Sequence, residues 1–211
     1  MNVLVITEDF RTDAYIIGPI VTAILRAIGN TTAKVKILRD PLMGAVETAL
    51  NARVLAEVVE RYRGMTHLFL LLVDRDGSEG RRDRLAQIEE WSQQVLGADQ
   101  CMMAECAFQE VEVWALAGIK DLPSAWRWDD VRACRDPKEI YFNEFAKLQD
   151  IGANPGGGRK ELGVEAGKNI KRVLQLCPEL HHLKSRIAEF VETRSSRMRP
   201  FAPLFPAITT A

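Results

Sequence analysis

The chain has 211 residues, a formal net charge of −1 and 47% hydrophobic residues, a balance typical of a globular protein with a sizeable core. No apolar run approaches the ~20 residues of a membrane-spanning helix, and the opening MNVLVITEDF predicts a strand and not a signal peptide. The four cysteines lack metal-finger spacing, which favours free thiols in a reducing cytoplasm.

The charge is unevenly distributed along the chain. Residues 1–150 carry 18 Lys and Arg against 24 Asp and Glu, whereas residues 151–211 carry 10 against 5. An acidic body with a basic C-terminal part fits a metal-bearing core beside a phosphate-binding arm. It fits equally a chain whose two parts pack against each other through their charges.

Short apolar runs alternate with amphipathic segments in the first half of the chain. Strands are predicted at 2–6, 33–38, 67–73 and 100–106, and helices at 12–29, 44–64, 79–97 and 109–118. This alternation predicts an α/β fold: a mostly parallel, four-stranded, Rossmann-like sheet flanked by helices.

The pattern changes after the fourth strand. Two helices are predicted within 121–148, a Gly-rich loop at 151–163, and helices at 165–177 and 178–194. The division is therefore an α/β core at 1–120, an α-helical C-terminal part at 121–195 and an irregular tail at 196–211.

Acidic side chains follow three of the predicted strands. Glu8 follows the first strand, Asp74 and Asp76 follow the third, and Glu110 and Glu112 come soon after the fourth. The carboxyl ends of parallel strands form the ligand-binding edge of such a sheet. Converging carboxylates need a neutralising cation, and oxygen ligands suit Mg²⁺ or Mn²⁺. Asp74-Arg-Asp-Gly77 is also good turn chemistry without any metal, because Asp caps its own backbone and Gly supplies a positive φ.

A strand that ends in Glu, followed by a strand that ends in Asp-x-Asp, resembles the Toprim fold of topoisomerases, primases and nucleases of the OLD family. The segment FQEVEVWALAG and the segment DPKEIYF are similar to segments of small stand-alone bacterial Toprim-like proteins. The resemblance covers roughly residues 2–142. It implies a Toprim-like core and Mg²⁺-dependent cleavage of nucleic acid.

The resemblance also implies roles for individual residues. Glu8 matches a metal ligand or general base and acid, and Asp74 and Asp76 match the Mg²⁺-binding pair. Glu112, with Glu110 beside it, matches later acidic ligands. The sequence departs from the family at residue 9, because Asp replaces the usual Gly, and the next acid, Asp13, comes one position late.

A late lysine is implied as well, to stabilise charge on the scissile phosphate. Lys138 lies in the matching Pro-Lys-Glu segment, and Lys160 and Lys168 are the alternatives. Each of the three is more readily interpreted as a solvated surface lysine.

Three further features favour structural roles. The stretch NPGGGRK lacks the Walker A pattern and reads as a surface loop, although its amides could meet a phosphate. His181 and His182 read as surface residues of a helix, and Trp114, Trp126 and Trp128 as packing residues more than as base-stacking ones.

The leading expectation is a Mg²⁺-dependent nuclease or phosphodiester-processing subunit that acts on DNA or RNA in a bacterial anti-phage defence system. An ATPase partner would be a separate protein, and a homo-oligomer is left open. One alternative is a haloacid-dehalogenase-type phosphatase with Asp74 as nucleophile, although its motif should follow the first strand of the core. The other is a metal-binding regulatory module without catalysis.

Overall fold

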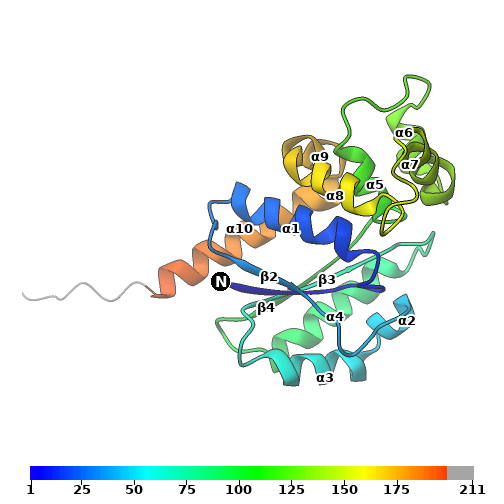
Figure 1. Ribbon diagram of the computed structural model, residues 1–211. Coiled ribbons are helices and arrows are strands. Elements are labelled where there is room, and N and C mark those ends of the chain that lie inside the picture. The colour runs from blue at the N-terminus through cyan, green and yellow to red at the C-terminus, as the bar shows by residue number, and fades with distance from the viewer. Residues whose placement is uncertain (199–211) are drawn as a thin grey trace, which may run out of the picture.

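The computed structural model describes residues 1–198, and its centre is a four-stranded parallel sheet with the strand order β2-β1-β3-β4 (Figure 1). The strands are β1 (Asn2–Ile6), β2 (Lys34–Ile37), β3 (Leu68–Val73) and β4 (Cys101–Cys106). All neighbouring pairs are parallel, so the carboxyl ends of the strands lie at one edge. The predicted α/β fold with a helical C-terminal part is therefore confirmed.

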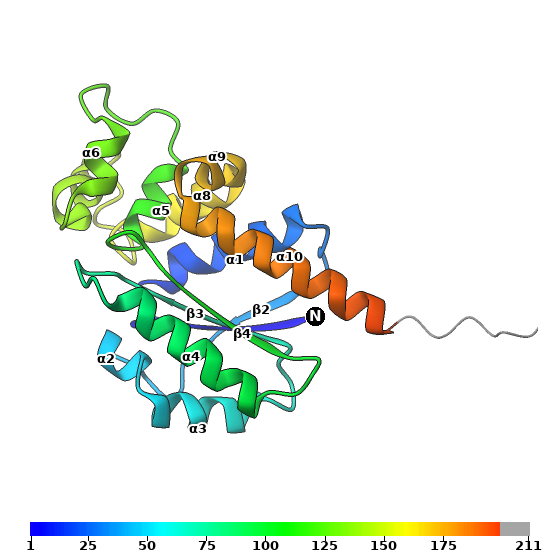
Figure 2. The ribbon, with the colours of Figure 1, turned by 180° about the vertical axis from the view of Figure 1, so that it is seen from behind.

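Helices cover both faces of this sheet (Figures 1 and 2). One face carries α2 (Val46–Ala49), α3 (Ala52–Tyr62) and α4 (Arg81–Val95). The other carries α1 (Ala14–Ala27), α5 (Glu112–Ala117), α8 (Arg159–Lys168), α9 (Ile170–Leu176) and α10 (Pro178–Met198). The short helices α6 (Trp128–Ala133), η1 (Lys138–Phe142) and α7 (Asn143–Leu148) lie at the end of α5.

Burial on both faces explains the apolar strands. All six residues of β3 are buried, and alternate side chains enter two different clusters. Leu70 faces the cluster under α1 and α10, whereas Phe69 faces the cluster under α3 and α4. The first cluster also contains Ile187 of α10. The predicted boundary at residue 120 stays a prediction.

Several predicted elements differ from the structure. The helix predicted at 44–64 is two helices, because Asn51 interrupts it and its side chain accepts hydrogen bonds from the N–H groups of Arg53 and Val54 to cap α3. The loop predicted at 151–163 is shorter, because α8 already begins at Arg159. The tail predicted at 196–211 begins within α10, which ends at Met198, and its remainder lies outside the described residues.

Glycine allows α8 to pack directly on α1. A Cβ atom on Gly163 would lie 2.1 Å from the carbonyl oxygen of Tyr15, and one on Gly118 would lie 2.3 Å from the Cα of Ala166. Both distances are far below any real contact, so no side chain fits at either position. This packing fixes the N-terminus of α8 relative to the start of α1.

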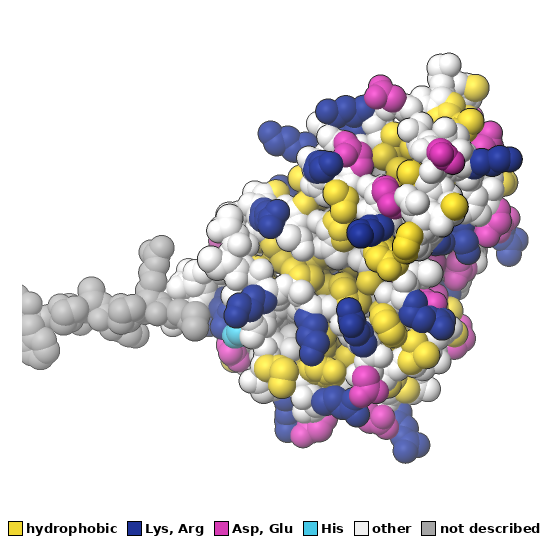
Figure 3. Space-filling model, in the orientation of Figure 1, with side chains coloured by type: hydrophobic (Ala, Val, Ile, Leu, Met, Phe, Trp, Pro, Cys, Tyr) yellow, Lys and Arg dark blue, Asp and Glu magenta, His cyan; other side chains and the backbone are white. Residues whose placement is uncertain are grey.

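Ion pairs connect the basic C-terminal part to the acidic body. Arg159 pairs with Glu112, and Arg186 pairs with Glu89 at 2.6 Å. On the face that Figure 3 shows, Lys and Arg side chains are spread out, with apolar and acidic groups between them. The charge asymmetry is thus used, at least in part, for packing the two parts together.

The remaining expectations from composition can be compared briefly. The four cysteines are free; Cys106 and Cys177 are buried, and the other two are half-buried. No helix within residues 1–198 is long and apolar enough to cross a membrane.

Candidate functional site

Glu8 and Asp74 meet at the carboxyl edge of the sheet. The strands β1 and β3 are neighbours, with Ile6 paired to Leu71, so the loops that follow them start side by side. The Glu8 carboxylate accepts a hydrogen bond of 2.7 Å from the backbone N–H of Asp74. Two acids that are 66 residues apart in the sequence are thereby joined.

Asp74 is the most perturbed acid of this edge. Its Oδ1 accepts a hydrogen bond of 2.8 Å from the N–H of Val111. Burial raises the pKa of Asp74 well above its ordinary value, and the negative charges of Glu8, Glu112 and Asp13 raise it further. The charges of three neighbouring acids thus act on Asp74.

The Glu8 carboxyl shares this environment. Burial raises the pKa of Glu8 to about 7, and the charges of Asp76 and Asp13 add to the rise. The hydrogen bond from Asp74 and the positive charge of Arg81 act in the opposite direction. A carboxyl group with a pKa near 7 is suited to exchange a proton at neutral pH.

Asp13 is held by the loop that precedes α1. Its Oδ2 accepts hydrogen bonds from the hydroxyl of Thr7 at 2.7 Å and from the N–H of Asp9 at 3.0 Å. Asp9 itself forms an ion pair with Arg11 and is turned to that side. Asp13 therefore contributes negative charge to the site while its carboxylate orders the loop.

Asp76 lies in a tight turn beside the cluster. Its φ is 50° and that of Gly77 is 68°, so the predicted turn chemistry is present. The N–H groups of Arg75 and Asp76 both donate to the carbonyl of Gln109, which anchors the turn. Burial raises the pKa of Asp76, while Arg81 and Lys138 lower it. The turn and the acidic site are thus one feature and not alternatives.

Glu112 is buried and paired. The Nη2 and Nε groups of Arg159 both donate hydrogen bonds to its Oε1, and the Nε–Oε1 distance is 2.9 Å. The guanidinium of Arg159 also lies 5.5 Å over the ring of Phe142. Since α8 is fixed against α1, this arginine is a built-in counter-charge for Glu112.

Glu110 points to the start of η1. Its Oε2 accepts a hydrogen bond of 2.9 Å from the backbone N–H of Lys138, and burial raises its pKa to about 7. Glu112 also raises this pKa, so Glu110 lies on the outer side of the same acidic edge.

Lys138 differs from the two other candidate lysines. Its positive charge lowers the pKa of both Asp76 and Glu110. Lys138 itself pairs with Glu139 at 3.6 Å. Lys168 pairs with Glu165 at 3.3 Å on α8, and Lys160 is exposed on the same helix. Among the three, Lys138 therefore acts electrostatically on the candidate acids.

Two arginines of the site were not singled out from the sequence. Arg159 was part of NPGGGRK, and its position just after three glycines of positive φ gave no indication of its partner, Glu112. Arg81 follows the Asp-x-Asp-Gly turn and is 7% exposed. The signal that could have identified Arg81 is its position: it and the adjacent arginine follow such a turn, in a segment that starts a helix.

The acids do not form a closed cage. Among residues 1–198, no three His, Cys, Asp or Glu side chains are grouped so that they could hold a metal ion together. Glu8 and Asp74 each use one carboxylate oxygen for a hydrogen bond, and no described residue donates to the other one. Their all-oxygen donor set fits a hard cation such as Mg²⁺, bound mainly to water and a few carboxylates.

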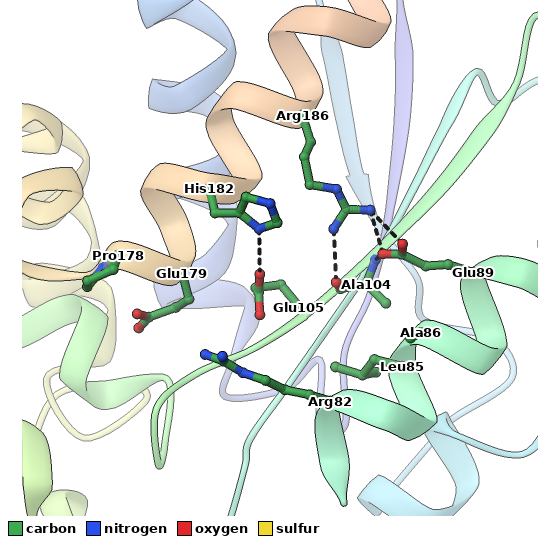
Figure 4. A pocket seen from close by; sticks show the side chains of 10 residues that line it. All are labelled: Arg82, Leu85, Ala86, Glu89, Ala104, Glu105, Pro178, Glu179, His182 and Arg186. Carbon is green, nitrogen blue, oxygen red and sulfur yellow. Dashed lines mark hydrogen bonds and ion pairs between the residues drawn. The ribbon is translucent and has the colours of Figure 1, made fainter.

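A separate cavity of about 330 Å³ lies at the outer edge of β4, between α4 and α10 (Figure 4). Arg186 pairs there with Glu89, and Nδ1 of His182 is 3.7 Å from Glu105. Arg82 points toward Glu105 and Glu179. None of the predicted site residues lines this cavity, so it is distinct from the acidic edge.

The aromatic and histidine expectations are largely confirmed. Trp114 is fully buried and donates to Glu179 at 2.9 Å, and Trp126 packs on Tyr141. His181 and His182 are exposed on α10.

Comparisons with protein-family models, with curated proteins and with solved structures give no match to this chain.

Proposed function

We propose that the chain is a Mg²⁺- or Mn²⁺-dependent phosphodiesterase that cleaves nucleic acid, with Glu8, Asp74 and Asp76 as the central acids. The observation that carries the proposal is the meeting of Glu8 and Asp74 at the carboxyl edge of β1 and β3. Burial, followed by the negative charges of neighbouring acids, raises the pKa values of both groups, so added positive charge would favour their ionised forms. A bound divalent cation would supply that charge and would polarise a phosphate ester.

The residues of the chain divide the remaining tasks. Asp74 and Asp76 hold the cation, and Asp74 is oriented for this by the N–H of Val111. Glu8, with a pKa of about 7, exchanges the proton of the attacking water or of the leaving oxygen. Lys138 contributes positive charge beside Asp76, where negative charge develops on a phosphate during cleavage.

Glu110 and Glu112 support these acids in this proposal. Glu112 is neutralised by Arg159, and Glu110 fixes the start of η1 through the backbone of Lys138. Glu112 thus acts on Asp74 through its charge, and Glu110 acts on Lys138 through a hydrogen bond. Neither carboxylate is assigned to the cation in this proposal.

The resemblance to Toprim proteins agrees with this assignment of Glu8, Asp74 and Asp76. A role in bacterial defence, with a separate ATPase subunit, rests on that resemblance alone and belongs to the same proposal.

The test is cleavage of supercoiled plasmid DNA and of transfer RNA with Mg²⁺ or Mn²⁺, with chelator as the blank. Asp74→Asn and Glu8→Gln should each lower the rate at least about 100-fold, the lower range of acid–base contributions. Glu144→Gln, an exposed acid on α7, is the matched control and should leave the rate unchanged. Unchanged cleavage by Asp74→Asn would refute the site.

Two other outcomes would favour the alternatives. Hydrolysis of p-nitrophenyl phosphate that is lost in Asp74→Asn, without cleavage of nucleic acid, would support a phosphatase. Calorimetric Mg²⁺ binding without turnover of either substrate would support a regulatory metal-binding module.

A further inference from the structure

Arg81 is a buried arginine without a partner. It is 7% exposed, and its Nε is fully buried and makes no hydrogen bond. Within residues 1–198 its guanidinium takes part in no ion pair either, whereas Arg132, Arg159 and Arg186 each grip a carboxylate. A buried polar group without a partner costs free energy, so this exception needs a reason.

Other arginines with an unpartnered Nε differ in position. Arg172 and Arg194 are only half-buried and lie on α9 and α10, away from the acidic edge. Arg81 instead lowers the pKa of both Glu8 and Asp76, so its charge lies beside the site. It is the first residue of α4, directly after the turn that carries Asp76.

The start of α4 adds further donors. The helix has 15 residues, and Gly80 at its N-cap provides no capping side chain. The backbone N–H groups of Arg82 and Asp83 donate to no carbonyl or side chain of the preceding residues, although Asp83 places an exposed carboxylate in the same turn. Free N–H groups at a helix N-terminus attract anions, and a guanidinium matches the oxygens of a phosphate.

We propose that Arg81 and the first turn of α4 form a binding site for a phosphate group of the substrate, next to Glu8 and Asp76. Arg81 is then a positioning residue that holds the phosphate while the acids act on it. This inference rests on the proposed function for the identity of the substrate, but the anion site can be tested without any catalysis.

The neighbouring arginine provides a matched control. Arg82 carries the same charge, but it points into the cavity at the edge of β4 and not toward the acidic site (Figure 4). Arg81→Gln and Arg82→Gln therefore change the net charge equally but act at different sites, the first at a buried side chain and the second at an exposed one.

The direct test is a titration of the full chain with inorganic phosphate, observed through the Nε–H resonances of its arginines by NMR. The resonance that disappears in Arg81→Gln should shift with phosphate, and more strongly when Mg²⁺ is present. The proposal is overturned if this resonance does not move, or if the phosphate affinity of Arg82→Gln falls as much as that of Arg81→Gln.

A kinetic test separates the inference from the proposed function. Arg81→Gln should raise KM for nucleic acid at least about tenfold, which corresponds to the loss of one charge-assisted contact. Arg81→Lys should restore part of it, and Arg82→Gln should leave it unchanged. Cleavage with an unaltered KM in Arg81→Gln would overturn the phosphate site and leave the nuclease intact. Phosphate binding that depends on Arg81, without any cleavage of nucleic acid, would support the phosphate site and overturn the proposed nuclease function.

Loss of folding is a lesser concern at this position than at a paired arginine. Arg81 forms no ion pair within residues 1–198, so its removal breaks no buried pair, although Glu8 and Asp76 lose the positive charge that lowers their pKa values. Circular dichroism of Arg81→Gln and Arg81→Lys verifies the fold before either titration.

Discussion

The Glu8 carboxylate accepts the backbone N–H of Asp74 across 2.7 Å, and this contact links the ends of β1 and β3. It places the charge of Glu8 where it raises the free energy of ionising Asp74. Without a bound cation, the ionised form of Asp74 is therefore electrostatically unfavourable at this edge. Such strain is what a site for a cation is expected to show.

Asp74→Asn should stabilise the fold while it abolishes metal binding. The amide keeps an oxygen that can accept the N–H of Val111, and it removes the charge that Glu8 and Glu112 oppose. We expect a higher Tm at pH 8, where each 1 kcal/mol of added stability would correspond to roughly 2–4 °C for a chain of this size. Thermal denaturation with chelator measures it. A lower Tm would show that Asp74 is structurally required in its charged form.

The stability of the chain should fall as the pH rises from 5 to 8. The pKa of Glu8 is about 7 in the folded state against an ordinary value of 4.5, so the folded state binds more protons between these values. The favourable contribution of Glu8 is thus complete below its ordinary pKa and is lost as the pH rises through the folded value. Glu8→Gln should flatten this dependence, as measured by urea unfolding at several pH values. Glu144→Gln should leave the slope as it is.

Binding of Mg²⁺ should release protons. Asp74 and Asp76 must be ionised to bind a cation, and both have raised pKa values in its absence. Affinity should therefore weaken below pH 7, and the heat of binding should depend on the ionisation enthalpy of the buffer. Calorimetry in two buffers of different ionisation enthalpy measures the proton count. Equal heats in both buffers would argue against these two acids as ligands.

Arg159→Ala should strongly destabilise the chain. It would leave the Glu112 carboxylate, whose side chain is 4% exposed, without its counter-charge. Breaking such a buried pair costs about 3–5 kcal/mol. Lys168→Ala, which removes an exposed pair from the same helix, should cost less than about 1 kcal/mol.

The double variant Arg159→Met with Glu112→Gln tests the reason for that loss. Because both charges are removed together, it should recover much of the stability lost in Arg159→Ala. If the double variant were as unstable as the single one, packing of the arginine on Phe142 would explain the effect better than charge.

Gly163→Ala should prevent α8 from docking on α1. Its Cβ would lie 2.1 Å from the Tyr15 carbonyl oxygen, so the helices would have to separate. We expect a loss of at least about 3 kcal/mol, beyond the usual range of a single substitution. Gly64→Ala, where no atom lies within 4 Å, is the control and should be tolerated. Circular dichroism and urea unfolding of both variants decide between these outcomes.

The sequence by itself determined the sheet and the acids that end its strands. Hydrophobic runs such as LFLLLV are local signals, and the edge at which Glu8 and Asp74 lie follows from the parallel topology that such runs imply. The turn at Asp76 and Gly77 could also be predicted from the sequence, because the preference of Asp and Gly for positive φ is a property of the single residue.

Only the tertiary structure decided which charges meet. Arg159 reaches Glu112 because two glycines let α8 approach its neighbours. The charge of Arg81 lowers the pKa of Glu8 and Asp76, while Arg82 points into the cavity beside β4 (Figure 4). The Arg159–Glu112 pair joins residues that are far apart in the chain. Arg81 and Arg82 are adjacent in the chain but lie on different sides of the same helix. No local pattern encodes these arrangements, because they arise from the packing of α4 and α8 onto the sheet.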